Sequence, residues 1–321
     1  MKRIHIIATG GTIAGIGKNI YDLTNYTSGV IPIEDIIGDM PELAEIADIS
    51  AENFCNIGSE DITKDHWLRL AKRVNQLAAD SSVDGIVITH GTDTMEETAF
   101  FLNLAVQTAK PIVLTGAMLP ATANKPDGPG NLTDAIRVAA DDKAPGRNIM
   151  AVMNRSIFSA NQVRKTHSSS INAFAAPNGQ RTGYVQNDTV IWQQQDEKID
   201  LHFDISAADK LPDVEILSMY ADFNPEIVQQ MLKVGINHII FDCFGNGTMP
   251  LPLTKAIAAA DGVFVNTTQT GSGKAEHIYT NLINGGSCTA KQARIIVMLW
   301  LTTKQSKHQL WEYLQRDEFF N

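Results

Sequence analysis

The sequence predicts an α/β protein with a larger N-terminal domain, built on a mainly parallel sheet flanked by helices, and a smaller C-terminal α/β domain. Short apolar runs alternate with segments of helical period, which is typical of a parallel sheet covered by helices. This alternation stops in a polar stretch at residues 193–213 and resumes after it. The chain has 321 residues, which is long enough for two domains of ordinary size.

We place the N-terminal domain at residues 1–192. Its expected elements, in order, are a strand with a glycine turn at 2–11, a helix at 65–80, a strand with a turn at 85–94, a helix at 95–107, a strand at 110–118, a helix at 131–142 and a strand at 147–154. Residues 181–193 alternate polar and apolar side chains, which indicates antiparallel strands.

Residues 193–213 are polar, contain a proline and show little helical period, so we expect a linker there. The C-terminal domain then covers residues 214–321. Its expected strands lie at 214–220, 237–247 and 262–271, and its expected helices at 224–235, 253–261 and 289–304.

The composition is that of a soluble globular protein, and its charge does not argue against a small zwitterionic or cationic ligand. Hydrophobic residues make up 44% of the chain and charged residues 19%, and the net charge is −10. A nucleic-acid partner is not expected, because phosphates are bound by clustered Lys and Arg and the sequence has no such cluster. A membrane partner is not expected either, because no apolar run approaches the ~20 residues that a span needs.

The cysteines predict neither a metal site nor a disulfide framework. Cys55, Cys243 and Cys288 are far apart and lack metal-ligand spacing, so we expect buried, reduced thiols and no metal. No cofactor motif is present either. The chain starts with Met1-Lys2-Arg3 and runs directly into a strand, without the apolar segment of a signal peptide. We therefore expect a cytoplasmic protein; the alternative is a periplasmic protein whose signal peptide has been removed.

The glycine turn after the first strand, ATGGTIAG at residues 8–15, does not match a phosphate-binding loop. A dinucleotide fingerprint that starts at Gly10 needs glycine where Thr12 stands. A P-loop reading also fails, because Lys18 is followed by Asn19. The glycines instead leave the hydroxyl of Thr12 accessible. Two interpretations remain: a turn residue whose hydroxyl is bonded locally, or a functional hydroxyl.

The turn after a second strand, THGTDTMEET at residues 89–98, adds polar groups at the same sheet edge. Thr94 and Glu97 have the spacing of a capping box, and Asp93 suits a helix N-terminus. This accounts for Thr94 and Glu97 but leaves Thr92 beside Asp93 in the turn. Because carboxyl ends of parallel strands share one edge, Thr12 and Thr92 are expected at the mouth of one sheet. A threonine hydroxyl becomes a nucleophile when a nearby group takes its proton.

The sequence resembles the bacterial-type L-asparaginases, the asparaginase/glutaminase amidohydrolases that use threonine. ATGGTIA and HGTDT carry the resemblance, which covers essentially the whole chain. Further matching stretches are TNYTSG (24–29), NIGSEDIT (56–63), GAMLPATANKPDGPGNL (116–132), QVRKT (162–166), FGNG (244–247) and QAR in the last long helix. The tyrosine loop and the stretch at 116–132 look closer to the high-affinity, often exported type II subtype.

The resemblance implies a catalytic set. Thr12 matches the nucleophile that attacks the side-chain amide, releases ammonia and forms a β-aspartyl acyl-enzyme. Tyr26 matches a tyrosine on a flexible lid, which is expected at residues 15–29. Thr92, Asp93 and Lys165 match a second polar cluster. Lys165 acts either as a base, which requires a depressed pKa, or as a cation that orients Thr92 and Asp93. Backbone N–H groups near Thr12 and Thr92 are candidates for an oxyanion hole.

The resemblance also implies how an amino-acid substrate is held. Ser59, with the backbone at Gly58 and Asp93, is expected to bind the substrate carboxylate, and Glu60 with Asp93 is expected to face its ammonium group. Gly11 and Ala117 are further expected substrate-binding positions. Some relatives carry glutamine at the position of Glu60, and the acid resembles members with more glutaminase activity, so we expect L-glutamine as a secondary substrate.

A neighbouring subunit is expected to complete each site with Asn246 and Glu276, because the family forms homotetramers built as pairs of intimate dimers. Two alternative functions remain. One is the glutaminase component of a tRNA-dependent amidotransferase, which carries a further N-terminal domain and binds RNA. The other is a non-catalytic α/β module that binds an amino acid.

Overall fold

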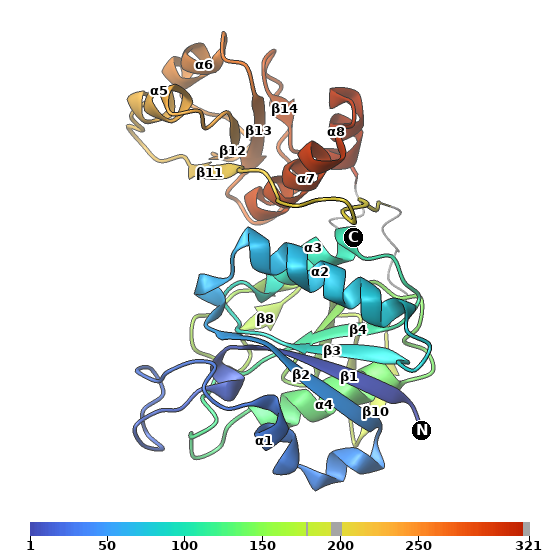
Figure 1. The fold of residues 1–321 in the computed structure, drawn as a ribbon. Helices are drawn as coiled ribbons and strands as arrows, with labels where there is room; N and C mark the ends of the chain where they lie inside the picture. The colour runs from blue at the N-terminus through green and yellow to red at the C-terminus, as the bar shows by residue number, and fades with distance from the viewer. Residues whose placement is uncertain (178, 194–200, 317–321) are drawn as a thin grey trace. The chain divides into compact units, whose positions relative to one another are not determined.

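The computed structural model describes residues 1–177, 179–193 and 201–316. The chain divides into two compact units, Met1–His202 and Phe203–Asn321. Both units combine helices with a sheet, and the larger N-terminal unit carries a mainly parallel sheet, so the predicted fold class is confirmed (Figure 1). Residues 194–200, in the expected linker, lie outside the described residues.

The first unit is built on an eight-stranded sheet in the order β10-β9-β6-β5-β4-β3-β1-β2. Its strands are β1 (Arg3–Gly10), β2 (Asp48–Ile57), β3 (Gly85–Thr89), β4 (Ile112–Thr115), β5 (Met150–Met153), β6 (Ser156–Ser159), β9 (Gly183–Gln186) and β10 (Thr189–Trp192). Neighbours among β1 to β5 pair in parallel, whereas the pairs involving β6, β9 and β10 are antiparallel. The carboxyl ends of the parallel strands therefore share one edge.

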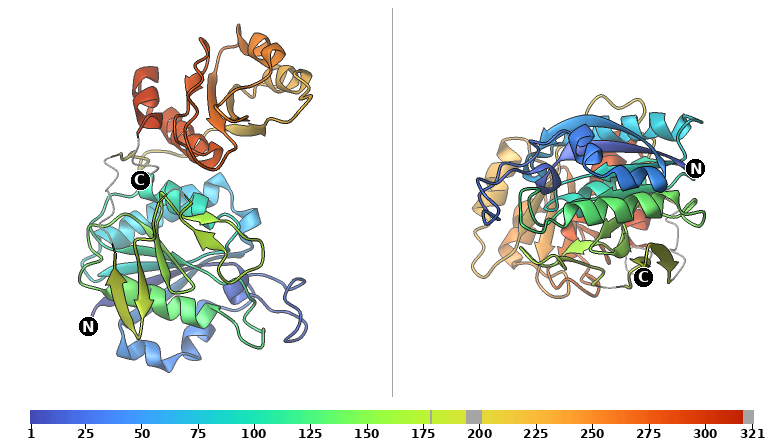
Figure 2. Two further views of the ribbon diagram at one scale, coloured as in Figure 1. Left: turned by 180° about the vertical axis from the view of Figure 1, so that it is seen from behind. Right: turned by 90° about the horizontal axis from the view of Figure 1, so that it is seen from below.

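Helices cover both faces of this sheet. They are α1 (Ile33–Gly38), α2 (Lys64–Ala79), α3 (Met95–Ala105) and α4 (Gly128–Ala140), with short 3₁₀ turns η1 (Thr12–Ala14), η2 (Pro41–Glu45) and η3 (Ser59–Asp61). Helices α2 and α3 lie on one face, and α1 and α4 lie on the other (Figures 1 and 2). A separate two-stranded ribbon pairs β7 (Arg164–Lys165) with β8 (Phe174–Ala175).

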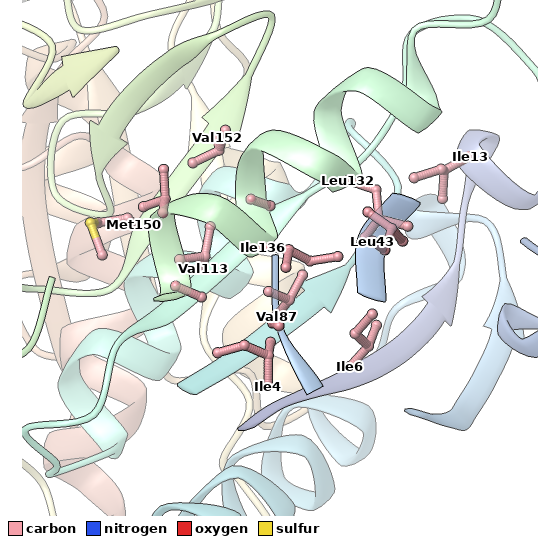
Figure 3. Packing of buried hydrophobic residues seen from close by; sticks show 14 of the residues in the cluster. Ile4, Ile6, Ile13, Leu43, Val87, Val113, Leu132, Ile136, Met150 and Val152 are labelled. Atoms are coloured by element: carbon pink, nitrogen blue, oxygen red, sulfur yellow. The ribbon is translucent and has the colours of Figure 1, made fainter. Parts of the chain in front are cut away.

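The central strands are buried on both faces, which explains their continuous apolar runs. Ile6 and Ile7 point to opposite faces, and both are fully buried. Under α4, Leu132 and Ile136 pack with Ile6 and Val87 in one cluster (Figure 3). This packing fixes the position of α4 against the sheet, and α4 follows the loop after β4.

Two sequence expectations for this unit are refined. Helix α4 begins at Gly128, three residues before the expected start, because Pro129 suits the first turn of a helix. The expected antiparallel strands at 181–193 are a hairpin of β9 and β10. Its turn residues Asn187 and Asp188 have φ of 47° and 61°, the positive values that a tight hairpin turn requires.

The second unit has a four-stranded sheet in the order β11-β12-β13-β14, paired in parallel throughout. Its strands are β11 (Glu215–Ser218), β12 (His238–Cys243), β13 (Val263–Thr268) and β14 (Ile283–Asn284), and its helices are α5 (Glu226–Lys233), α6 (Leu251–Ile257), α7 (Ala290–Thr303) and α8 (Lys307–Leu314). Helices α5 and α6 pack on a cluster that includes Phe241 and Phe264. Strand β14 and helix α8 were not expected from the sequence.

All three cysteines are free thiols. Cys243 and Cys288 are buried as expected, but Cys55 is only half-buried, because it lies on the edge strand β2. Burial raises the pKa of the Cys55 thiol to about 11 and that of Cys243 to about 12, so both stay protonated at neutral pH. Among the described residues, no helix is both long and apolar enough to cross a membrane.

Candidate active site

The expected site residues of the first unit gather at the carboxyl edge of its sheet. In the sheet, β1 lies between β3 and β2. The chain places β2 on one side of β1 and then β3 on the other side, so the strand order reverses between β1 and β3. Open α/β sheets bind ligands at such a switch point. Thr12 follows β1, Thr92 follows β3, and Ser59 follows β2.

The turn after β1 depends on glycine. Gly10 and Gly11 have φ of 100° and 79°, values that side chains other than glycine rarely adopt. A Cβ atom on Gly11 would lie 2.5 Å from the backbone nitrogen of Gly91, so the turns after β1 and β3 are packed backbone to backbone. Residue Thr12 begins η1 and is only 7% exposed.

The hydroxyl of Thr12 is not bonded locally. Its Oγ1 lies 2.7 Å from the hydroxyl of Tyr26, which is fourteen residues further along the chain. The interpretation of Thr12 as an ordinary turn residue with a local hydrogen bond is therefore wrong. The ring of Tyr26 lies against Gly15, where a Cβ atom would come within 2.8 Å of the ring.

The segment that carries Tyr26 is anchored at its base. Ile16 and Thr27 exchange backbone hydrogen bonds, and the N–H of Gly17 donates to Oγ1 of Thr122 on the loop after β4. The outer part of the segment is exposed, and Tyr21 is 81% exposed. The segment thus covers Thr12 while most of its own length stays in contact with solvent.

The structure brings Thr92, Asp93 and Lys165 together. The Nζ atom of Lys165 donates to Oγ1 of Thr92 at 2.8 Å and contacts the carboxylate of Asp93 at 2.5 Å. Thr92 is 5% exposed, whereas the side chain of Asp93 is 62% exposed. Lys165 comes from β7, far away in sequence, so this cluster depends on tertiary structure.

The capping box expected from Thr94 and Glu97 is absent from the described start of α3. The hydroxyl of Thr94 instead donates to the carbonyl of Ser59 at 2.8 Å, and no side chain caps this helix end. The hydroxyl oxygen of Ser59, in turn, accepts a hydrogen bond from the N–H of Asp93 at 3.1 Å. This prediction was wrong because η3 lies beside the turn after β3 and provides the hydroxyl of Thr94 with a nearer partner.

The remaining expected positions of this unit line the same edge. Ser59 is 3% exposed, Ala117 is fully buried and Glu60 is exposed. A side chain on Gly58 would overlap the carboxylate of Glu60, so glycine lets that carboxylate fold over the turn. The bond from Asp93 uses the oxygen of Ser59 as an acceptor and does not consume its hydroxyl proton.

Two residues without a role in the sequence analysis shape the loop that holds Ala117. The carboxylate of Asp127 accepts the N–H groups of Met118 and Leu119. The amide of Asn131 donates to Asp127 and to the carbonyl of Gly116. The Asp-Gly-Pro sequence at 127–129 was a usable signal, because aspartate before a helix start often bonds nearby N–H groups.

The second unit brings Asn246 and Glu276 together. Oδ1 of Asn246 accepts the N–H of Glu276 at 2.8 Å, and both residues are exposed. The buried amide of Asn266 on β13 donates to the carbonyls of Gly247 and His277 at 3.1 Å and 3.0 Å. Asn266 therefore ties the two segments to each other, a role that its sequence context did not reveal.

A directional chain of hydrogen bonds supports the turn after β3. The indole N–H of Trp67 donates to Oγ1 of Thr98, which lies 2.9 Å from Nε2 of His90. The other ring nitrogen, Nδ1, is 2.7 Å from the carbonyl of Gly91. A carbonyl only accepts, so Nδ1 carries the proton, and Nε2 accepts from Thr98. Complete burial lowers the pKa of His90 to about 4, so the ring is neutral.

No group of three His, Cys, Asp or Glu side chains in the described parts of the chain is arranged to hold a metal ion. The site is instead made of hydroxyls, one lysine, carboxylates and backbone N–H groups. The fold and site together define a doubly wound α/β protein with paired threonines at its switch point.

This chain belongs to the asparaginase family. Residues 3–198 match the family model for the N-terminal domain of asparaginase, and residues 213–314 match the model for the glutaminase/asparaginase C-terminal domain. The chain is 37% identical to L-asparaginase 2 of Bacillus subtilis, over 98% of this chain and 86% of the relative. It is 36% identical to a protein of Haemophilus influenzae named probable L-asparaginase periplasmic, over 98% of this chain and 93% of that relative.

A solved structure shares the fold throughout. The crystal structure of a probable cytoplasmic L-asparaginase from Campylobacter jejuni matches with a TM-score of 0.93 at 33% identity, covering 98% of this chain and 99% of that chain. These matches do not favour the amidotransferase component or the non-catalytic binding module.

The neutral His90 makes the stability of the first unit depend on pH. Its pKa is about 4 in the folded chain but close to 6.5 when unfolded. Between these values the unfolded chain binds the extra proton, so His90 contributes full stability above pH ~6.5 and loses up to about 3 kcal/mol of it by pH ~4. Urea unfolding at several pH values should therefore show a flatter pH dependence for His90→Gln than for wild type.

The matched control is His308→Gln, because His308 is a histidine with a 76% exposed side chain. This variant should keep the wild-type pH dependence. Identical slopes for wild type and His90→Gln would contradict a neutral, buried His90.

Proposed function

We propose that this protein hydrolyses L-asparagine to L-aspartate and ammonia through Thr12 and a β-aspartyl acyl-enzyme. The observation that carries the proposal is the position of the buried Thr12 hydroxyl, which lies at the switch point, 2.7 Å from the hydroxyl of Tyr26. On the adjoining turn, Thr92 accepts a hydrogen bond from Lys165. The family supports an amide substrate. The stretch at 116–132 and the tyrosine loop support the type II subtype.

In the first step, Oγ1 of Thr12 bonds to the carboxamide carbon of the substrate. The hydroxyl proton passes through the hydroxyl of Tyr26 to the leaving nitrogen, the C–N bond breaks and ammonia departs. The short contact between the two hydroxyls supports this relay. Closure of the segment over Thr12 supports the exclusion of bulk water during the step.

The charge that develops on the carbonyl oxygen needs N–H donors. Among the described residues, no hydrogen bond uses the backbone N–H of Thr12 or of Thr92. Both groups sit on the two turns that contact each other through Gly11 and Gly91. We assign them to the oxyanion hole, which is often the largest electrostatic contribution to acyl transfer.

In the second step, water attacks the ester carbon and Thr12 leaves with a proton. Lys165 in its ammonium form donates to Thr92 and Asp93, so we assign it the orienting role. Thr92 and Asp93 then position the attacking water. The bond of Lys165 to a carboxylate supports this choice over a role as the free base.

Recognition of the substrate follows its charges. The hydroxyl proton of Ser59 is a donor for the α-carboxylate, with the backbone at Gly58 beside it. Asp93 and Glu60 supply negative charge for the α-ammonium. We also assign Gly11 and Ala117 to the substrate site. Ala117 is fully buried, and a Cβ atom on Gly11 would collide with the backbone of Gly91, so only glycine fits there. L-Glutamine, one methylene longer, is the proposed secondary substrate, as the description of the C-terminal family model supports.

We further propose a homotetramer, built as a dimer of intimate dimers, in which Asn246 and Glu276 complete the ammonium site of a neighbouring subunit. The direct bond between these two exposed residues supports a shared role. For the compartment we propose the cytoplasm, which the three free thiols support. The name of the Haemophilus influenzae relative keeps the periplasm as the alternative.

The nucleophile is tested by removing one hydroxyl. Thr12→Val keeps the size of the side chain, so ammonia release from L-asparagine should fall roughly 10³-fold or more. The assay compares L-asparagine, L-glutamine and D-asparagine. The control Thr9→Val removes another buried hydroxyl, which bonds to the carbonyl of Thr89, and should stay active within roughly tenfold. Comparable activity of Thr12→Val and wild type would refute the role of Thr12.

Substrate preference is tested at Glu60. Wild type should release ammonia from L-glutamine, and Glu60→Gln should lower the glutamine-to-asparagine ratio of kcat/KM by roughly threefold to tenfold. Asp61→Asn, which neutralises the next exposed acid, should leave the ratio unchanged. If wild type leaves glutamine untouched, the proposed secondary activity is wrong.

The shared site is tested by mixing two impaired chains. Thr12→Val and Asn246→Ala each damage a different half of the site, so co-expression should form mixed dimers in which one of the two sites is fully wild type. Activity should therefore exceed that of either variant alone. The control is the same two substitutions placed in one chain. Absence of recovery in purified mixed oligomers would show that Asn246 does not act across subunits.

A further inference from the structure

Lys165 lies on a strand that does not belong to the main sheet. Strand β7 pairs with β8 in a separate two-stranded ribbon, in which Lys165 is opposite Phe174. The next residue, Thr166, donates its N–H to Ala173 within the same ribbon. These bonds define the ribbon but do not set its position against the turn after β3. Another contact must bring the backbone of Lys165 to the switch point.

Glu96 supplies such a contact. It lies in the first turn of α3, is 8% exposed, and its Oε2 accepts the backbone N–H of Lys165 at 2.8 Å. The start of a helix is also where a carboxylate is electrostatically favoured. A buried hydrogen bond to a carboxylate is stronger than the same bond in water.

One short segment therefore holds both ends of Lys165. Thr92 and Asp93 bind its ammonium group, and Glu96, on the following helical turn, binds its backbone. Asp93 is largely exposed, so solvent screens its ion pair with Lys165. The contact of Glu96 is buried and fixes where the lysine side chain starts.

We propose that Glu96 is a positioning residue that sets the reach of Lys165 to Thr92 by accepting its backbone N–H. This inference rests on the proposed orienting role of Lys165 in the hydrolysis. Glu96 acts through the reach of its acceptor oxygen rather than through its charge. Length and charge can be separated at this position, because glutamine keeps the length and loses the charge, whereas aspartate keeps the charge and is one methylene shorter.

The experiment measures kcat and KM for ammonia release from L-asparagine, with thermal unfolding as a check on folding. Glu96→Gln should keep kcat within about threefold of wild type, because its amide oxygen still accepts the N–H. Glu96→Asp and Glu96→Ala should lower kcat roughly tenfold to a hundredfold, because a displaced catalytic group loses reactive geometry. KM should not rise in step, because Ser59 and Glu60 are untouched.

The matched control is Glu97→Ala, which removes the neighbouring acid of the same helical turn and should keep wild-type kcat. A kcat for Glu96→Asp equal to or above that of Glu96→Gln would overturn the proposal, as would a loss of more than about tenfold in Glu96→Gln. Parallel changes of kcat and KM in Glu96→Ala would also overturn it. A wild-type protein that releases no ammonia from either amide would instead refute the proposed function itself.

Discussion

The site depends on the close approach of two glycine turns. Gly11 contacts the backbone of Gly91, where a Cβ atom would lie 2.7 Å from the hydroxyl oxygen of Ser59. A side chain at either glycine would force apart turns that follow three adjacent strands. The contact therefore fixes the spacing between the hydroxyls of Thr12 and Thr92 before any ligand arrives. Preorganised groups of this kind need little rearrangement during a reaction.

Buried hydrogen bonds support this frame, and exposed charges complete it. His90 ties the turn after β3 to Thr98 without a charge, since its pKa is about 4. Glu96 ties β7 to the same region. Asp93 and Glu60 remain open to solvent, where a zwitterionic substrate would meet them. Burying a charged group is unfavourable unless it is paired or hydrogen-bonded, as the carboxylate of Glu96 is, whereas neutral hydrogen-bonded groups such as His90 are tolerated in the core.

The features that could be predicted from the sequence are those that local residue patterns encode. Alternating apolar runs and helical periods predicted the two α/β units, and the glycine turns predicted the strand ends at Thr12 and Thr92. Strand β2 was not predicted because an edge strand lacks a continuous apolar run. Helix α8 was not predicted because only part of one face is buried. The capping prediction for Thr94 failed because a neighbouring turn competes for its hydroxyl. Glu96, Asn131 and Asn266 act on residues distant in sequence, so no local pattern marks them.

The most direct test of the account is to look for the ester on Thr12. Wild type mixed with L-asparagine, quenched in acid within the first turnovers and digested, should yield the peptide containing Thr12 with one added aspartyl group in its mass spectrum. Thr12→Val, treated identically, should yield no such adduct. An aspartyl adduct on Thr92 or on another side chain, with the Thr12 peptide unmodified during turnover, would contradict the central claim.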